Sequence, residues 1–410
     1  MLVATDRVGA LPAVEVAAAL GAGWRTERDD DLRSLPMSDG SGGVLAVLAD
    51  ASREVHLVPG PLGGTVPATI ARRAGTAWID ADEVLGAHVV PGRIGEALSA
   101  GSSTGLGVLV ARAVREGATR VVVGMTAAVV HDAGAGLVTA LAEAAHGRGD
   151  RAPDDDPQAW PERFAAARGL LTDVDVVVAR AVDDPLTGLH GAGAMLTERF
   201  GVDPADAQRH DRRAGSLAAE ILGARRASDL ARPAVTPLPV LGGGIGARAG
   251  GGAPSGAHSH GDEPARLDPS RTPGGGAGGG AALALAALGA RLFDGADVVA
   301  AELGLDGALD VLGQDGVVVT SATEVGSDEA RSSVMSGVGR RAAERALPVV
   351  AVGRTVTASR RELAPSGISA SAALVPGRLP DEEPAAADPA ALGRALEDRG
   401  ARLARTWSRR

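Results

Sequence analysis

Short apolar runs alternate with amphipathic stretches along the whole chain. β-Branched runs predict buried strands at 2–5, 54–58, 77–80, 119–123, 174–178, 316–320, 348–352 and 372–375. Helical spacing of apolar residues predicts helices at 12–20, 108–116, 204–224, 281–293, 298–312, 329–346 and 389–407. Strands that alternate with helices are typical of an α/β fold with mostly parallel sheets.

One stretch, 118–145, combines the features of a ligand-binding turn. A β-branched strand ends at Gly124, a loop follows, and Asp132-Ala133-Gly134-Ala135-Gly136 opens an apolar helix. A strand, a loop of small residues and a helix N-terminus can place an anion on free backbone N–H groups. Asp132 can instead simply cap that helix, which is the commoner role of such a residue. Both interpretations stay open at this point.

Length and composition limit the classes of protein to consider. A chain of 410 residues is too long for one ordinary core and predicts two domains. The net charge of −10 argues against nucleic acid and anionic membrane surfaces as partners. The chain has no cysteine, which excludes thiolate sites, and no lysine, which excludes a Walker-type phosphate loop. No apolar run predicts a membrane span, and Asp6 and Glu15 interrupt any signal peptide, so a cytoplasmic protein is expected.

The segment 242–275 differs in composition from the rest of the chain. Gly, Ala, Pro and Ser dominate it, and such a sequence buries too little apolar surface to fold, so a flexible linker is expected. His258, His260, Asp262 and Glu263 lie within it. These side chains are possible metal ligands, although a disordered Gly-rich setting favours an incidental cluster.

Eight short motifs resemble, in order, those of the bacterial two-domain glycerate kinase family. They are Pro36-Met37-Ser38-Asp39-Gly40, 60–63 (GPLG), 102–107 (SSTGLG), 132–136 (DAGAG), 182–186 (VDDPL), 273–280 (PGGGAGGG), 315–320 (DGVVVT) and 375–377 (VPG). Each motif is weak by itself. Together they cover nearly the whole chain.

The resemblance implies a fold class of two α/β domains with the active site between them. One domain is Rossmann- or flavodoxin-like and discontinuous, formed by 1–58 with 281–378. The other is inserted and spans 59–241. The linker 242–275 and a C-terminal helical tail, 379–410, complete this division. The implied activity is transfer of the ATP γ-phosphoryl group to a hydroxyl of D-glycerate, with ATP and Mg²⁺ as cofactors and a small hydroxy acid as the partner.

The resemblance also implies roles for particular residues. The catalytic candidates are Asp39, Asp132 and Asp183. The candidates for binding substrate or phosphate are Asp6, Arg7, Ser103, Thr104, Gly105, Gly107, Gly134, Gly136, Asp184, Gly274 and Gly276. A working site would further predict that Asp132→Ala abolishes turnover without unfolding the protein.

The chain departs from the family pattern at chemically important positions. The lysine of the family's first loop is absent, and Arg7 is the neighbouring cation; it is longer and bidentate, so the two are not equivalent. Gly42 stands at a glutamate position of the family. After the strand at 316–320, Ala322, Gly326 and Ser333 stand where the family has a glutamate, an aspartate and a lysine, and Glu324 and Asp328 are displaced by two residues.

These departures leave alternatives to an active kinase. A catalytically degenerate homologue could keep the two-domain cleft as a binding or regulatory module. Each candidate could also be purely structural, with Asp39 in a turn, Asp132 as a cap and Asp183 and Asp184 as loop acids before Pro185. A nicotinamide-dependent oxidoreductase is disfavoured because the Gly-rich runs lack the strand and acid of that fingerprint.

Overall fold

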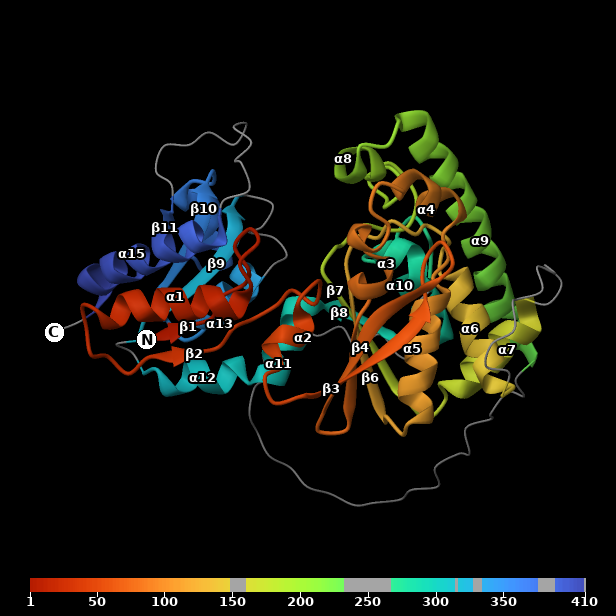
Figure 1. Ribbon diagram of the computed structural model, residues 1–410, viewed down its shortest axis with the longest axis horizontal. Helices are drawn as coiled ribbons and strands as arrows, with labels where there is room; N and C mark the ends of the chain where they lie inside the picture. The colour runs from red at the N-terminus through yellow and green to blue at the C-terminus, as the bar shows by residue number, and fades with distance from the viewer. Residues whose placement is uncertain (148–159, 232–266, 314–315, 327–333, 375–387, 409–410) are drawn as a thin grey trace, which may run out of the picture.

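The chain folds into two lobes, each built on one β-sheet (Figure 1). A computed structural model describes residues 1–147, 160–231, 267–313, 316–326, 334–374 and 388–408. The predicted linker cluster around His258, as well as Asp328, Ser333 and the 375–377 motif, lies outside these residues. The expected fold class, α/β with two sheet-containing domains, is confirmed.

The first lobe holds a parallel five-stranded sheet. Its order is β11 (Ala370–Ala373), β10 (Val349–Val356), β9 (Val318–Val325), β1 (Leu2–Val3) and β2 (Arg33–Ser34). Helices α1 (Ala13–Arg25) and α15 (Pro389–Trp407) cover one face. Helices α12 (Leu305–Val311) and α13 (Val334–Ala343) cover the other. Because side chains alternate along a strand, Val3 faces α1 while Leu2 faces the opposite core.

The second lobe holds a mixed six-stranded sheet. Its order is β3 (Ser52–Pro59), β4 (Thr65–Arg73), β5 (Thr76–Asp80), β6 (Arg120–Met125), β7 (Asp175–Arg180) and β8 (Arg291–Asp294). The first three strands are antiparallel and the pairs from β5 to β8 are parallel. The expectation of mostly parallel sheets is confirmed, and the antiparallel edge is the exception to it: the Ala74-Gly75 turn, with positive φ at both residues, allows a hairpin there.

Helices cover the two faces of this second sheet unequally. One face carries α5 (Thr104–Arg115), α6 (Ala135–Ala145), α7 (Trp160–Leu170), α9 (Pro204–Ala231) and α10 (Ala281–Leu288). The other face carries Trp78 and Val122 and packs on α2 (Val44–Val47) and α11 (Gly295–Leu303). The same core cluster continues into the first sheet through Leu2 and Val318. The two lobes thus share one apolar core, with α2 and α11 between them (Figure 1).

Shorter helices complete the lobes. They are α3 (Asp82–Leu85), α4 (Ile94–Ala100), α8 (Leu196–Phe200), α14 (Arg360–Leu363) and the 3₁₀ turns Ala87–Val89, Ala277–Gly280 and Ala364–Ser366. In the described ranges no single helix is long and apolar enough to cross a membrane; α4 and α5 meet the length and composition test only as a pair bent by 69°.

Three expected segment boundaries differ in the structure. The helix predicted at 281–293 ends at Leu288, since Gly289 has φ +115°, and β8 then pairs with β7. Residues 281–294 therefore belong to the second lobe, where α10 packs on the sheet and β8 is part of it, rather than to the Rossmann-like lobe. The expected linker is too long, because Pro269 and Gly274 are held by backbone hydrogen bonds to Thr187 and Asp183. The helix predicted at 298–312 is two helices, separated at Gly304 (φ +70°).

Candidate active site

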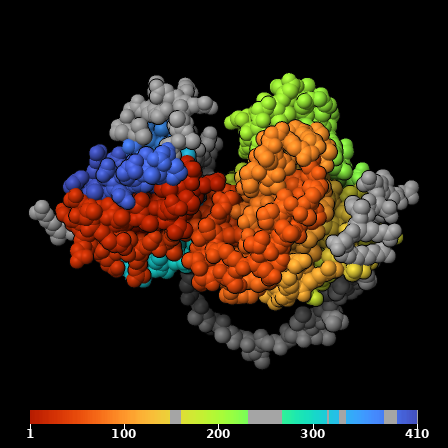
Figure 2. Space-filling view, viewed as in Figure 1, coloured from red at the N-terminus to blue at the C-terminus, as the bar shows by residue number. Residues whose placement is uncertain are grey.

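The candidate active site lies where carboxyl ends of strands from both sheets meet. In open α/β sheets ligands bind outside this edge. Asp6 follows β1, Asp39 follows β2, and Asp80 ends β5 of the other sheet. Two hydrogen bonds cross between these loops: Arg7 Nη1 donates to Gly42 O at 3.2 Å, and Gly43 N donates to Asp80 Oδ2 at 2.9 Å. A groove separates the two lobes in the space-filling view (Figure 2).

Asp6 is the most perturbed acid of this group. Burial, and then the neighbouring charge of Asp39, raise its pKa to about 7, against the opposing effects of the Arg7 N–H and guanidinium. The Arg7 amide donates to Asp6 Oδ1 at 2.7 Å, and Ser321 Oγ of β9 donates to the Asp6 carbonyl at 2.7 Å. The strand pairing of β1 with β9 therefore fixes this loop.

Asp39 is held in a tight turn. Its Oδ1 accepts hydrogen bonds from Ser41 N at 2.9 Å and Ser41 Oγ at 2.6 Å. The next residue, Gly40, has φ +91° and its backbone touches the second lobe. A β-carbon on Gly124 of β6 would lie 2.0 Å from the Gly40 carbonyl, and one on Gly295 would lie 1.8 Å from the Asp39 carbonyl. Two glycines of the second lobe thus let the Asp39 turn approach the sheet closely.

We expect Gly124→Ala to destabilise the fold by about 1–3 kcal/mol, the usual cost of overpacking, and to displace Asp39. Denaturant unfolding measures the change in stability. Gly169→Ala is the matched control, because a β-carbon there meets nothing within 4 Å and the residue lies on the exposed side of α7. Equal stability for Gly124→Ala and wild type would show that the turn moves freely.

Asp80 and Asp82 add two more carboxylates at this edge. Burial raises the pKa of Asp80 to about 6, with a smaller contribution from the charges of Asp82 and Glu83. Asp80 Oδ1 accepts a hydrogen bond from Asp82 N at 3.1 Å. A β-carbon on Gly42 would lie 3.1 Å from Asp82 Oδ2 and 3.4 Å from Arg7 Nη1, so the exposed Arg7 side chain reaches the same place.

The acid pair Asp6 and Asp39 suits a divalent cation. Mg²⁺ commonly uses one or two protein carboxylates together with substrate phosphates and water. Burial and then the charge of Asp39 raise the pKa of Asp6, and a bound cation would offset the repulsion between the two acids. The residues present therefore fit Mg²⁺.

Asp132 and Ser103 form a separate, buried group at the N-termini of α5 and α6. Asp132 Oδ2 accepts from Ser103 N (2.8 Å), Ser103 Oγ (2.9 Å) and Gly136 N (3.1 Å), and Asp132 Oδ1 accepts from Gly134 N (3.0 Å). Ser103 Oγ in turn accepts from Leu137 N at 3.0 Å. The protein's own carboxylate therefore occupies the place where an external anion could bind. Between the two interpretations of Asp132, this geometry favours the cap.

The predicted glycines around this group serve close packing. A β-carbon on Gly105 would lie 2.1 Å from the Pro59 carbonyl, and one on Gly107 would lie 2.6 Å from the Leu137 carbonyl. Gly134 has φ +79°, and a β-carbon on Gly136 would lie 2.2 Å from Ser102 Oγ. Gly107 and Gly136 therefore let α5 and α6 approach each other closely, whereas Gly105 lets α5 approach the end of β3.

Thr104 lines an open cavity beside this group. The cavity has a volume of about 410 Å³ and is bordered by Ser102, Asp132, Arg163 and Arg213. Ser102 Oγ and Thr104 Oγ1 are hydrogen-bonded to each other at 2.7 Å. Two hydroxyls and two arginines suit a carboxylate or phosphate oxygen.

The predicted residues Asp183, Asp184, Gly274 and Gly276 form a third group. Asp183 forms an ion pair with Arg180, and Asp184 with Arg199 at 2.5 Å. Gly274 N donates to the Asp183 carbonyl at 2.8 Å, and Gly276 N donates to the Asp184 carbonyl at 3.0 Å. The two glycine amides are thus engaged with the protein backbone rather than open to a phosphate.

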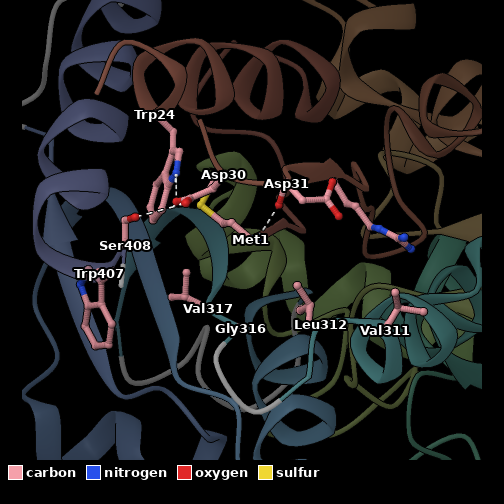
Figure 3. Close-up of a pocket in the computed structure, with 11 residues that line it drawn as sticks. Met1, Trp24, Asp30, Asp31, Val311, Leu312, Gly316, Val317, Trp407 and Ser408 are labelled. Atoms are coloured by element: carbon pink, nitrogen blue, oxygen red, sulfur yellow. Dashed lines mark hydrogen bonds between the residues drawn. The ribbon is translucent and has the colours of Figure 1, made fainter. Parts of the chain in front are cut away.

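Two further features belong to the five-stranded sheet, one near each end of its strands. Glu324, one of the displaced acids, accepts a hydrogen bond from Thr357 Oγ1 at 3.1 Å. A cavity of about 260 Å³ lies at the opposite, amino end of the five-stranded sheet, beside Met1, Trp24 and Trp407 (Figure 3). Asp30 there accepts from Trp24 Nε1 at 2.9 Å and from Ser408 Oγ at 3.2 Å (Figure 3). No predicted site residue lines it.

Sequence reasoning missed Asp80, Asp82 and Arg213. Asp80 ends a run that was predicted as a strand, 77–80, and an acid at the carboxyl end of a strand is a usable signal. Arg213 gives no such signal, because it lies in the charged helix α9 and reaches its cavity only through tertiary packing.

These features define a two-lobed α/β protein with a carboxylate cluster where the two sheets meet. The family model described as "Glycerate kinase family" matches residues 1–408. The chain belongs to the glycerate kinase family, which supports a glycerate kinase-like function and a small-molecule substrate.

Individual relatives agree with this assignment. Glycerate 2-kinase of Escherichia coli is 27% identical over 358 residues, which cover 85% of this chain and 82% of that protein. An uncharacterised protein of Mycobacterium tuberculosis is 28% identical over 378 residues, covering 90% and 83%. A crystal structure from Salmonella typhimurium, provisionally assigned as glycerate kinase 2, matches with a TM-score of 0.67 at 23% identity and covers 99% of this chain and 97% of its own.

Proposed function

We propose that this protein transfers the γ-phosphoryl group of ATP to a hydroxyl of D-glycerate at the meeting edge of its two sheets. The observation that carries the proposal is the placement of Asp6, Asp39 and Arg7 together at the carboxyl ends of β1 and β2, next to Asp80 of the other sheet. Family membership supports the reaction class.

Phosphoryl transfer depends mainly on positioning and on neutralising charge. Asp6 and Asp39 would hold Mg²⁺, which supplies charge neutralisation on the phosphates when it is bound. The exposed Arg7 side chain, tethered to the Gly42 carbonyl, would face a phosphate oxygen. Its planar guanidinium donates two parallel hydrogen bonds, so it would orient the phosphate as well as neutralise it.

The roles proposed for Asp39, Asp132 and Asp183 differ from those that the family resemblance implies. Asp39 keeps its proposed place beside Mg²⁺. Asp132 has four intramolecular donors, so its proposed role is to fix the helices α5 and α6 rather than to meet substrate. Asp183 is half-exposed and paired with Arg180, which supports a role in holding the loop after β7.

Incubation of purified protein with ATP, Mg²⁺ and D-glycerate, followed by direct detection of phosphoglycerate, tests the proposal. We expect turnover that chelation of Mg²⁺ abolishes, and Arg7→Ala to lower kcat/KM for ATP. Absence of turnover combined with a thermal shift from ATP or glycerate would support the degenerate homologue, a binding or regulatory module. Absence of both would contradict any role in binding these compounds.

A further inference from the structure

We propose that Glu54, His56 and Glu116 form a second metal site, specific for a transition metal such as Zn²⁺ and separate from the proposed Mg²⁺ site. One carboxylate oxygen of each glutamate and one ring nitrogen of His56 lie within 4.8 Å of one another. One imidazole and two carboxylates form a donor set that suits Zn²⁺ or Co²⁺ better than Mg²⁺, which prefers oxygen ligands alone.

The fold brings these three side chains to one face. Glu54 and His56 are two residues apart on β3, so both point to the same side of the sheet. Glu116 is the C-cap residue of α5, which packs on that side. The site therefore connects the edge strand of the six-stranded sheet to the end of its neighbouring helix.

Within the residues that the structure describes, His56 has a buried ring nitrogen without a hydrogen-bond partner, which a metal ion could bind. The residue is only 6% exposed, and its Nε2 has no hydrogen-bond partner among the described residues. That atom lies 3.9 Å from Glu54 Oε2, too far for a hydrogen bond. Buried polar atoms nearly always have a partner, so an unpaired imidazole nitrogen facing carboxylates points to a ligand.

Arg112 competes with the metal. Its Nη1 lies 3.1 Å from His56 Nδ1, and since arginine only donates, Nδ1 accepts and the neutral ring carries its proton on Nε2. A metal at Nε2 requires that proton to move to Nδ1, which then repels Arg112. The Arg112 side chain is 48% exposed and can turn into solvent.

The other charges around the site also favour a modest affinity. Glu116 forms an ion pair with Arg72 and lies 4.0 Å from Arg112. A bound dication would compete with both guanidinium groups for the same carboxylate. Glu54 is mostly exposed, and His56 is the one residue it contacts as an ion pair among the described residues. It is therefore the ligand that binding perturbs least.

Titration of the full-length, metal-stripped protein with Zn²⁺ by calorimetry, and with Co²⁺ by visible absorption, tests the site. We expect binding with Co²⁺ bands of low coordination number. Glu54→Gln and His56→Gln are expected to weaken binding at least about tenfold. Arg112→Gln is expected to strengthen it, because the competing donor is gone.

Two controls separate this site from other metal ligands. The double variant His258→Ala/His260→Ala and the variant Asp39→Asn should leave Zn²⁺ binding at His56 unchanged, because each removes candidate ligands that are not among the three residues of this site. Far-ultraviolet circular dichroism confirms that each variant is folded, and the exposed Glu54→Gln serves if His56→Gln does not fold. Unchanged Zn²⁺ affinity in Glu54→Gln, or weaker binding in Arg112→Gln, would overturn the proposal.

Discussion

Replacing Asp6 by asparagine is expected to lower turnover by about 10²–10³, the usual loss when one group that stabilises the transition state is removed. The same substitution is expected to raise the unfolding temperature at pH 8. The two changes have opposite effects on the protein. Asp6 would help to hold Mg²⁺ during the reaction, whereas its buried negative charge destabilises the folded protein. Product formation and thermal unfolding, measured on one preparation, give both values.

The pH dependence of that stability gain follows from the pKa of Asp6. The folded value is raised to about 7 from an ordinary 3.8, so the folded protein binds more protons than the unfolded chain between these limits. The contribution of Asp6 to the stability of the wild-type protein therefore falls as pH rises from about 4 to about 7. The advantage of Asp6→Asn should grow across this window and stay constant above it.

Asp398→Asn is the matched control for the Asp6 variant. Asp398 lies exposed on α15, so its replacement removes one negative charge without changing the site. We expect its turnover and stability to equal those of wild type. An Asp6→Asn protein with wild-type turnover would remove Asp6 from the mechanism, and one less stable than wild type at pH 8 would contradict the electrostatic account.

Asp132→Ala is expected to destabilise the fold by more than about 3 kcal/mol. The substitution leaves the amides of Ser103, Gly134 and Gly136 without their acceptor in a buried place. Hydrogen bonds to a charged group contribute about 1.5–3 kcal/mol each, and unpaired buried donors add a penalty. Denaturant unfolding measures the loss. For a working site, the sequence predicted that this substitution abolishes turnover without unfolding; the four hydrogen bonds instead support an expected loss of stability.

A cap of ordinary strength provides the comparison for Asp132. In the part of the chain that the structure describes, Asp203 Oδ1 accepts one hydrogen bond, from Ala205 N at 2.8 Å, at the exposed start of α9. Asp203→Ala should therefore cost only about 1 kcal/mol. If Asp132→Ala costs no more than that while turnover disappears, Asp132 acts in the chemistry and the structural role proposed above is wrong.

The sequence predicted the fold class well because local patterns carry it. The strand predicted at 119–123 overlaps β6 (Arg120–Met125), and the C-terminal helix matches 389–407 at both ends. The hairpin strand β4 was not predicted, since Thr65–Arg73 is apolar and charged without a clear period and follows a Gly-rich turn. β8 was missed because Arg291–Asp294 continues the apolar pattern of the preceding helix, and only the two residues Gly289 and Ala290 separate the two elements.

The candidate site was predicted less well, for a different reason. Asp6, Arg7 and Asp39 could be named from motifs, and they lie at one edge of the structure. The motif containing Asp132 looked like an anion site because sequence does not show which acceptor fills a helix N-terminus. Here the partner, Ser103, is 29 residues away in sequence. Asp80 joins the site only through the approach of the second sheet.

The position of β1 inside its sheet sets an order for folding during synthesis. Leu2 pairs with Val318 on one side and with Arg33 on the other, and α1 packs on α15. The first strand and helix therefore leave the ribosome long before most of their partners exist, whereas β3 to β8 form a complete sheet in the meantime. During this interval Trp24 and Leu20, later fully buried, are exposed to solvent. Chaperones that recognise apolar segments would find a target in the segment that forms α1.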